Sequence, residues 1–403
     1  MNQSFMKHEF IIMSKSKKNI IFIIFLTALL FSYCFFILPN EQTSESFDPQ
    51  KLSYELEELS VEQKKREEDG YTGINVMTGV PVYAMNKYYY KLHSNLITAF
   101  EDQDFTRFVL LRTHYLEGNM GSIIGNPTLF PESPFPGKDR KHLYQQTLLR
   151  YQGYLDKDLP ISYALIEQKT ALQTLQKFLL SSASYLIIFC AVYFSSDIVV
   201  RDRQNRTILQ GLPLSWYRVL NIKTIVAFLY TIIVLSVLLI VGMFTVSLQS
   251  GFGFFNIQMP IMIARTGTSF NDYDSITIFQ FIVKAMIFIP ILVYLFTRLS
   301  VLLSLLFKNE WLVLLVSTIV LFSERLYYSR TLREIFGIEV SYFPQTYFEF
   351  GKVVSGDKNF LVNLDTITYV KGIIVLMITI VIIEGVLYMV SRIINKRRFY
   401  QTN

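Results

Sequence analysis

Long apolar stretches alternate with polar segments along the chain, and the longest of them have the length of membrane-spanning helices. A helix that crosses about 30 Å of hydrocarbon needs roughly 20 mostly apolar residues. The stretches predicted to be transmembrane helices are 19–38, 177–200, 222–248, 276–307, 311–328 and 370–394. The fifth has the shortest apolar core, which ends at Phe322 before Glu324 and Arg325. The pattern therefore predicts an α-helical integral membrane protein with six transmembrane helices.

The first apolar stretch follows Lys15, Lys17 and Lys18, an arrangement that a signal peptide would share. Its apolar core is longer than the roughly 7–15 residues of a signal peptide, and no small-x-small cleavage pattern follows it. We therefore interpret 19–38 as a retained span that enters the membrane after a short basic segment.

The polar segment 39–176 is long enough to form a folded domain outside the membrane, between the first two spans. Apolar residues recur at helical spacing in 49–69 and in 86–117, and helices are also expected at 139–155 and 161–176. The last of these could run directly into the second span. A Gly/Pro-rich stretch, 118–137, is predicted to be a loop. The domain is therefore expected to be mostly helical.

The charges are distributed unevenly and indicate an orientation. Residues 40–176 carry 14 Lys and Arg against 19 Asp and Glu, so the rest of the chain holds the whole net positive charge. Its basic residues gather at 7–18, 201–223 and 392–398, and at Lys308. With six spans these segments share one face, which the positive-inside rule assigns to the cytoplasm. Basic residues within 329–369 run against the rule. The prediction is a multi-pass protein of a bacterial cell membrane with both termini cytoplasmic.

Several classes of function lack support in the sequence. Basic residues beside apolar spans do not indicate nucleic-acid binding. Cys34 and Cys190 lie in apolar stretches, so no disulfide framework is expected. His114 and Glu117 could share a helix face but lack a third metal ligand at defined spacing. There is no H-E-x-x-H motif and no G-x-S-x-G motif, and we expect neither a metal site nor an enzyme.

The segment after the second span, 201–223, resembles the corresponding loop of ABC type 2 permeases, the membrane subunits of one class of ATP-binding-cassette exporters. That family has an acid, a Gly-Thr pair, a Leu-rich turn, a Pro-hydrophobic-Ser run and a Lys at the next span. The matching residues here are Asp202, Thr207, Leu209, Leu212, Pro213, Leu214, Ser215 and Lys223. Arg206 departs from the pattern, since the family often has Gly there. The start of the chain and the run Tyr342-Phe343-Pro344 also resemble the family.

The resemblance implies a division of the chain that includes its cytoplasmic and outer segments. It implies a cytoplasmic amphipathic interfacial helix at 1–18, a coupling loop at 201–221, an extracellular re-entrant loop at 329–369 and a cytoplasmic tail at 395–403. The coupling helix would dock on a separate ATPase, because the chain lacks the G-x-x-x-x-G-K-[ST] phosphate loop. The residues assigned to ATPase coupling are Asp202, Arg203, Arg206, Thr207, Leu209, Leu212 and Pro213. The working unit would contain two ATPase copies, which bind ATP and Mg, and a second permease copy or homologue.

Ionisable residues inside the predicted spans are costly and so are functional hypotheses. Lys284 and Glu384 lie deep in the fourth and sixth spans, and Glu324 lies in the fifth. One interpretation places these three along a translocation path, with Lys284 paired to an acid. The other is a structural pair or a contact with the lipid surface. Arg298 is nearer a helix end and is expected to extend toward the membrane surface.

Two functions therefore remain open. The first is an exporter permease that moves an amphipathic substrate (a peptide, lipid or drug) outward. The second is a membrane sensor or immunity protein that binds an extracellular peptide through 39–176. The aromatic-rich spans fit an amphipathic substrate, although lipid-facing Phe has the same composition.

Overall fold

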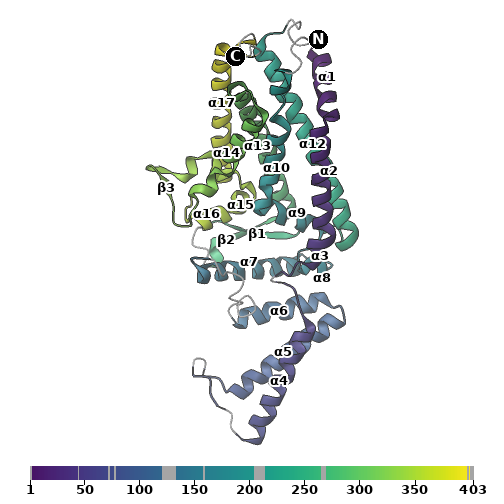
Figure 1. The fold of residues 1–403 in the computed structure, drawn as a ribbon. Helices are drawn as coiled ribbons and strands as arrows, with labels where there is room; N and C mark the ends of the chain where they lie inside the picture. Colours follow the sequence, from purple (N-terminus) through teal and green to yellow (C-terminus); the bar gives the residue numbers. More distant parts are fainter. Residues whose placement is uncertain are drawn as a thin grey trace.

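The computed structural model describes residues 2–43, 45–70, 73–76, 79–119, 133–157, 159–203, 214–264, 269–396 and 399. The described chain is mostly helical and forms a bundle of long helices with a smaller helical region at one end (Figure 1). Both chain termini lie at the opposite end of the bundle. We call the two ends the domain end and the terminal end.

Five helical segments are long and apolar enough to cross a membrane, so the chain has the character of a multi-pass membrane protein. They run over Lys17–Asn40, Ser182–Arg203, Trp216–Ser250, Ile278–Phe307 and Tyr369–Ile393. The first combines α2 (Lys17–Ser32), the π-helical η1 (Tyr33–Ile37) and α3 (Leu38–Asn40). The second combines η3 (Ser182–Ser184), α10 (Tyr185–Ser195) and η4 (Val200–Arg203). The other three are single helices, namely α12, α13 and α17.

The predicted fifth span is a helix, α14 (Glu310–Tyr327), but it is less apolar than the other five. It carries Glu310, Glu324 and Arg325 within 18 residues. A tight turn joins it to α13: Lys308 takes the left-handed conformation, and the Asn309 side chain accepts hydrogen bonds from Trp311 and Leu312. Such a turn makes consecutive helices antiparallel neighbours.

α13 is the central helix of the bundle, and α10, α12, α14 and α17 all pack against it. A capping box between Thr277 and Gln280 begins the helix, which continues through Pro290. Its inward face carries Phe281, Phe288 and Phe296, each fully buried. The outward surfaces of α12 and α17 expose large apolar side chains instead. This arrangement suits helices whose outer surface contacts lipid.

The helix predicted at 1–18 exists as α1 (Asn2–Lys15), and one of its faces packs against the bundle. Phe5, Glu9 and Met13, spaced four residues apart, form this buried face. The Phe10 ring contacts the Tyr230 ring of α12 at 5.7 Å. α1 therefore lies beside α12.

The segment between the first two spans forms six helices within its described residues. They are α4 (Pro49–Glu68), α5 (Val82–Glu101), α6 (Phe105–Asn119), α7 (Pro136–Asp156), α8 (Tyr163–Ile166) and α9 (Ala171–Leu180). The region predicted as one helical stretch, 86–117, divides between α5 and α6. Gln103 between them has a positive φ of 58°, which is incompatible with a continuous helix.

Local geometry corrects one further prediction for this segment, and the structure adds one element that was not predicted. The helix expected at 161–176 does not run into the second span, because Ser181 is extended and its side chain accepts a hydrogen bond from the Ala183 amide. A β-ribbon that was not predicted, β1 (Gln258–Met262) with β2 (Tyr273–Thr277), precedes α13 and packs on α7. Glu45, almost fully buried, accepts a hydrogen bond from Arg150 at 2.8 Å and so ties the chain after α3 to α7.

The segment predicted as a re-entrant loop, 329–369, contains a hairpin and short helices at the domain end. The hairpin pairs β3 (Glu334–Ile335) with β4 (Ile338–Glu339). After η6 (Val340–Tyr342) and η7 (Pro344–Tyr347) come α15 (Phe350–Ser355) and α16 (Asp357–Val362). α15 packs closely on α9, since a Cβ at Gly351 would lie 2.0 Å from the Leu179 carbonyl oxygen.

Candidate functional site

The predicted coupling loop is described at its two ends. Asp202 and Arg203 belong to η4, and the chain resumes at Leu214 before α12 (Trp216–Ser250). Arg206, Thr207, Leu209, Leu212 and Pro213, which were assigned to ATPase coupling, lie outside the described residues. The described part of the site is therefore the base of the loop.

A fully buried lysine joins the two described ends of the loop. Lys223 has 0% exposure, and its Nζ lies 2.9 Å from Asp202 Oδ1 and 2.9 Å from Glu9 Oε2. It also donates to the Ile198 carbonyl oxygen at 3.0 Å. All three donors of the ammonium group thus have an acceptor. Arg201 contacts Glu9 at 3.1 Å and completes what we call the Lys223 cluster: Glu9, Arg201, Asp202 and Lys223.

The Lys223 cluster connects three separate elements at the terminal end. Glu9 comes from α1, Arg201 and Asp202 from η4, and Lys223 from α12. Two cations balance two carboxylates, so the cluster has no excess charge. Asp202 is buried, and its carboxylate contacts Lys223 within the protein. Its role is to hold the base of the loop.

Sequence reasoning missed Glu9, because that segment was interpreted only as an amphipathic helix. The signal was present: Glu9 is the sole acidic residue among the first 40 residues. It shares a helix face with Phe5 and Met13, four residues away on either side. A lone acid on the apolar face of a helix indicates a buried cation nearby.

A second ionic contact at the terminal end involves Glu384, one of the predicted path residues. Arg298 of α13 (Ile278–Phe307) contacts Glu384 of α17 (Tyr369–Ile393) at 2.7 Å. The Tyr217 hydroxyl also donates to Glu384. Arg298 donates further to Asn221 at 2.7 Å and to Thr224 at 2.9 Å. The Arg298 side chain is 4% exposed, so these partners hold it inside the bundle.

The three predicted path residues do not converge on one site. Lys284 is half-buried and forms no ion pair with any described residue. It lies 14 residues before Arg298 on α13, roughly 21 Å along the helix axis. Glu384 already has Arg298 as its partner. The expected pairing of Lys284 with an acid is therefore absent from the part of the chain that the structure describes.

Glu324, the third predicted path residue, belongs to an ionic cluster at the domain end. Lys358 has 0% exposure, and its Nζ lies 2.5 Å from Glu324 Oε1 and 2.8 Å from Glu349 Oε2. Lys352 and Arg325 contact Glu349 at 2.9 Å and 3.2 Å. These five residues form the Lys358 cluster. Glu324 also accepts a hydrogen bond from the Tyr185 hydroxyl at 3.0 Å.

Ionisation in the Lys358 cluster is strongly favoured. Burial alone would raise the pKa of Glu349, but the charges of Lys358 and Lys352 outweigh it and lower the pKa to about 2. Burial opposes the charge of Lys358, whereas Glu324 and Glu349 raise its pKa above the ordinary value. Glu349 and Lys358 therefore stay charged across the ordinary pH range.

The described residues contain no group of three or more His, Cys, Asp or Glu side chains that could hold a metal ion. The geometry instead offers a buried ionic cluster at each end of the bundle, an ion pair between α13 and α17, and a buried Glu45 that contacts Arg112 and Arg150. A scan against protein-family models found no match, and searches of the curated proteins and of the solved structures found none either.

Proposed function

We propose that the chain is the membrane permease subunit of an ATP-binding-cassette exporter, which moves an amphipathic substrate outward with ATP hydrolysed by a separate subunit. The observation that carries the proposal is the Lys223 cluster. It ties the base of the loop 204–213 to α1 and α12 through buried ion pairs. A force applied to that loop by a soluble partner would reach three membrane-associated elements together.

The arrangement of the helices supports a six-span topology that includes α14. α14 packs against α10 and α13 within the bundle, while Trp311, Leu315 and Ile319 are exposed on its other side. An apolar face toward lipid and a polar end at Glu324 fit a short span. With six spans, both termini would lie on the cytoplasmic face of a bacterial cell membrane and the segment 39–176 would lie outside.

An exporter of this kind would need two kinds of partner. Two ATPase subunits would bind ATP and Mg and contact the loop 204–213 from the cytoplasm. A second permease copy or homologue would complete the transport path. Glu384 and Arg298, which join α13 and α17 beside the first turns of α12, are the charged residues best placed to respond when α12 moves.

Co-purification from the native membrane tests the proposal. The tagged full-length chain, extracted in a mild detergent, is expected to retain an ATPase subunit that carries a G-x-x-x-x-G-K-[ST] loop. Leu209→Asp places a charge in the proposed coupling segment and should abolish this retention. The matched control is Leu110→Asp on the exposed face of α6, which should leave it unchanged.

Two results would overturn the proposal. One is recovery of the chain without any ATPase under conditions in which the chain remains folded. The other is retention of the ATPase by Leu209→Asp at the same level as by the control variant. Binding of an extracellular peptide by an ATPase-free chain would favour the sensor function instead.

A further inference from the structure

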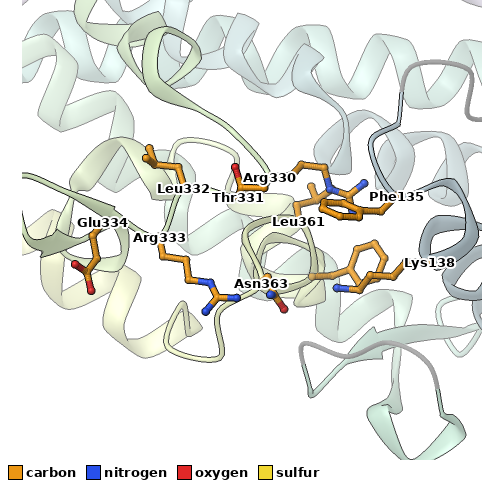
Figure 2. Close-up of a pocket in the computed structure, with 10 residues that line it drawn as sticks. Phe135, Lys138, Arg330, Thr331, Leu332, Arg333, Glu334, Leu361 and Asn363 are labelled. Atoms are coloured by element: carbon orange, nitrogen blue, oxygen red, sulfur yellow. The ribbon is translucent and has the colours of Figure 1, made fainter.

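A pocket of about 730 Å³ lies at the domain end, where the start of α7 meets the segment after α14 and the end of α16 (Figure 2). Its walls combine basic, aromatic and aliphatic side chains. The residues that line it include Phe135, Lys138, Arg330, Arg333, Phe360 and Asn363. None of them belongs to the two ionic clusters described above, so the pocket is a separate feature of the molecule.

One side of the pocket is a fixed basic and aromatic wall. Arg330 contacts Asp139 at 2.7 Å and lies over the rings of Phe135 and Phe360, at 5.5 Å and 5.3 Å. Burial opposes ionisation of Asp139, but the hydrogen bonds from Arg330 and Ser133 hold its pKa below the usual value. The Lys138 ammonium lies 4.4 Å from the Phe360 ring centre. Arg330 is thus already neutralised, and it shapes the pocket.

The other side of the pocket supplies a cation without an acid. Arg333 forms no ion pair with any residue that the structure describes. In Figure 2 its side chain points toward Asn363, and Lys138 approaches from the opposite side. Glu334, the only acidic residue among those lining the pocket, lies at its far edge in the same view. The Arg333 guanidinium and an amide group therefore face one small space beside the Lys138 ammonium, which favours an anionic ligand.

An exposed apolar surface adjoins the pocket. The hairpin of β3 and β4 follows Arg333 directly and projects sideways from the bundle in Figure 1. Phe336 at its tip is 101% exposed, and Ile338 is exposed as well. Phe336 also has a positive φ of 52°, which is unfavourable for a bulky residue. Its side chain gains no packing within the chain that would offset this cost.

The position of the pocket relative to the spans selects the ligand. Arg330 lies three residues after the end of α14 at Tyr327, and Leu326 of α14 is exposed. Basic side chains beside the end of a span, next to exposed aromatic and aliphatic residues, suit the boundary between lipid headgroups and acyl chains. A soluble anion would need the cations but not the apolar hairpin.

We propose that this pocket binds the phosphate headgroup of an anionic membrane lipid, with the hairpin tip at Phe336 lying among the acyl chains. Arg333 and Lys138 contact the phosphate, and Asn363 donates to its oxygens. Leu332 and Leu361, which also line the pocket, contact the glycerol and upper acyl region. The inference concerns lipid binding alone and does not rest on an exporter function.

The test is a titration of the purified full-length chain in dodecyl maltoside, a detergent without phosphate. The probes are dioleoyl phosphatidylglycerol, dioleoylglycerol and inorganic phosphate, and bound lipid is counted by native mass spectrometry. We expect saturable binding of phosphatidylglycerol with a clear preference over the other two. Arg333→Gln should weaken this binding about fivefold, the usual effect of one basic residue near an anionic headgroup.

Two further variants complete the test. Arg107→Gln on exposed α6 makes the same change of charge away from the pocket and should leave binding unchanged. Phe336→Ser should weaken phosphatidylglycerol binding without any effect on inorganic phosphate. Equal binding by Arg333→Gln and the unaltered chain would overturn the proposal. So would equal affinity for dioleoylglycerol, or for inorganic phosphate, since the first needs no headgroup site and the second indicates a soluble anion.

Discussion

The two ends of the bundle differ in how they neutralise a buried lysine. Each buries a lysine completely between two carboxylates, Lys223 at the terminal end and Lys358 at the domain end. The Lys223 cluster balances two cations against two acids, whereas the Lys358 cluster has three cations for two acids. The surplus makes the domain end tolerant of losing one partner. The terminal end has no surplus cation, and it adjoins the loop 204–213, which is expected to bind the ATPase.

Removing the buried lysine at the terminal end should have the largest effect on stability. Lys223→Met leaves Asp202 buried without a cation, although Glu9 retains Arg201. Breaking a buried ion pair from one side costs about 3–5 kcal/mol. Thermal unfolding in detergent, followed by circular dichroism, measures the loss. The double variant Lys223→Met with Asp202→Asn should recover part of it. An unchanged unfolding temperature for the single variant would show that the cluster contributes nothing to stability.

The matched change at the domain end should cost less. Lys358→Met leaves Glu349 with Lys352 and Arg325, and leaves Glu324 with the Tyr185 hydroxyl. We expect a loss of about 2 kcal/mol, within the range for a buried polar group that loses one partner. The same unfolding measurement, run beside Lys223→Met, compares the two ends. A larger loss at the domain end would refute the argument from surplus cations.

The ion pair between Arg298 and Glu384 separates stability from function at the terminal end. Glu384 keeps 31% exposure at its side chain, so Glu384→Gln should cost only about 1 kcal/mol. The proposed transport role predicts a much larger loss of transport-coupled ATPase activity in the reconstituted complex. The exchange of Arg298→Glu with Glu384→Arg should restore stability but not activity. Normal activity in Glu384→Gln would remove this residue from the mechanism.

The smallest expected effect is on how the stability of the domain end depends on pH. The pKa of Glu349 is about 2 in the folded chain, below its ordinary value of 4.5, so its ionised form stabilises the fold above pH 4.5. This contribution is lost only as the pH falls from about 4.5 toward 2. Lys352→Met should raise the pKa of Glu349 in the folded chain, which makes its contribution smaller and ends the loss at a higher pH. Unfolding temperatures measured from pH 7 down to about pH 2 compare the size of the loss, and identical pH profiles for variant and parent would contradict it.

The sequence predicts much of the bundle, because membrane spans depend on length and composition. Five of the six predicted spans correspond to long apolar helices in the structure. The predicted fifth span corresponds to α14, which is a more polar helix. Helix breaks between the first and second predicted spans were harder to predict. The positive φ of Gln103 and the extended Ser181 depend on tertiary packing, and neither residue type marks a break on its own.

The candidate site was predictable in its location but not in its partners. The loop that follows the second span is marked by its charges and by Pro213. Asp202 and Lys223 were both noted there, yet only the structure pairs them through a buried contact. Glu9 lies about 190 residues earlier in the chain, and no local pattern connects it to that loop. The partner of Arg298 was missed for the same reason: ion pairs between distant helices depend on how the helices pack.

The hydrophobic core extends through two regions of the molecule, and this bears on how the molecule folds. A single cluster of buried side chains continues from Phe108 and Tyr151 in the region 39–176 to Phe288 in the middle of the bundle. The two regions therefore share one hydrophobic core and form one cooperative unit. An excised fragment 39–176 would lose part of its core and should aggregate or remain partly unfolded. We expect the region 39–176 to complete its folding only once the helices of the bundle have assembled.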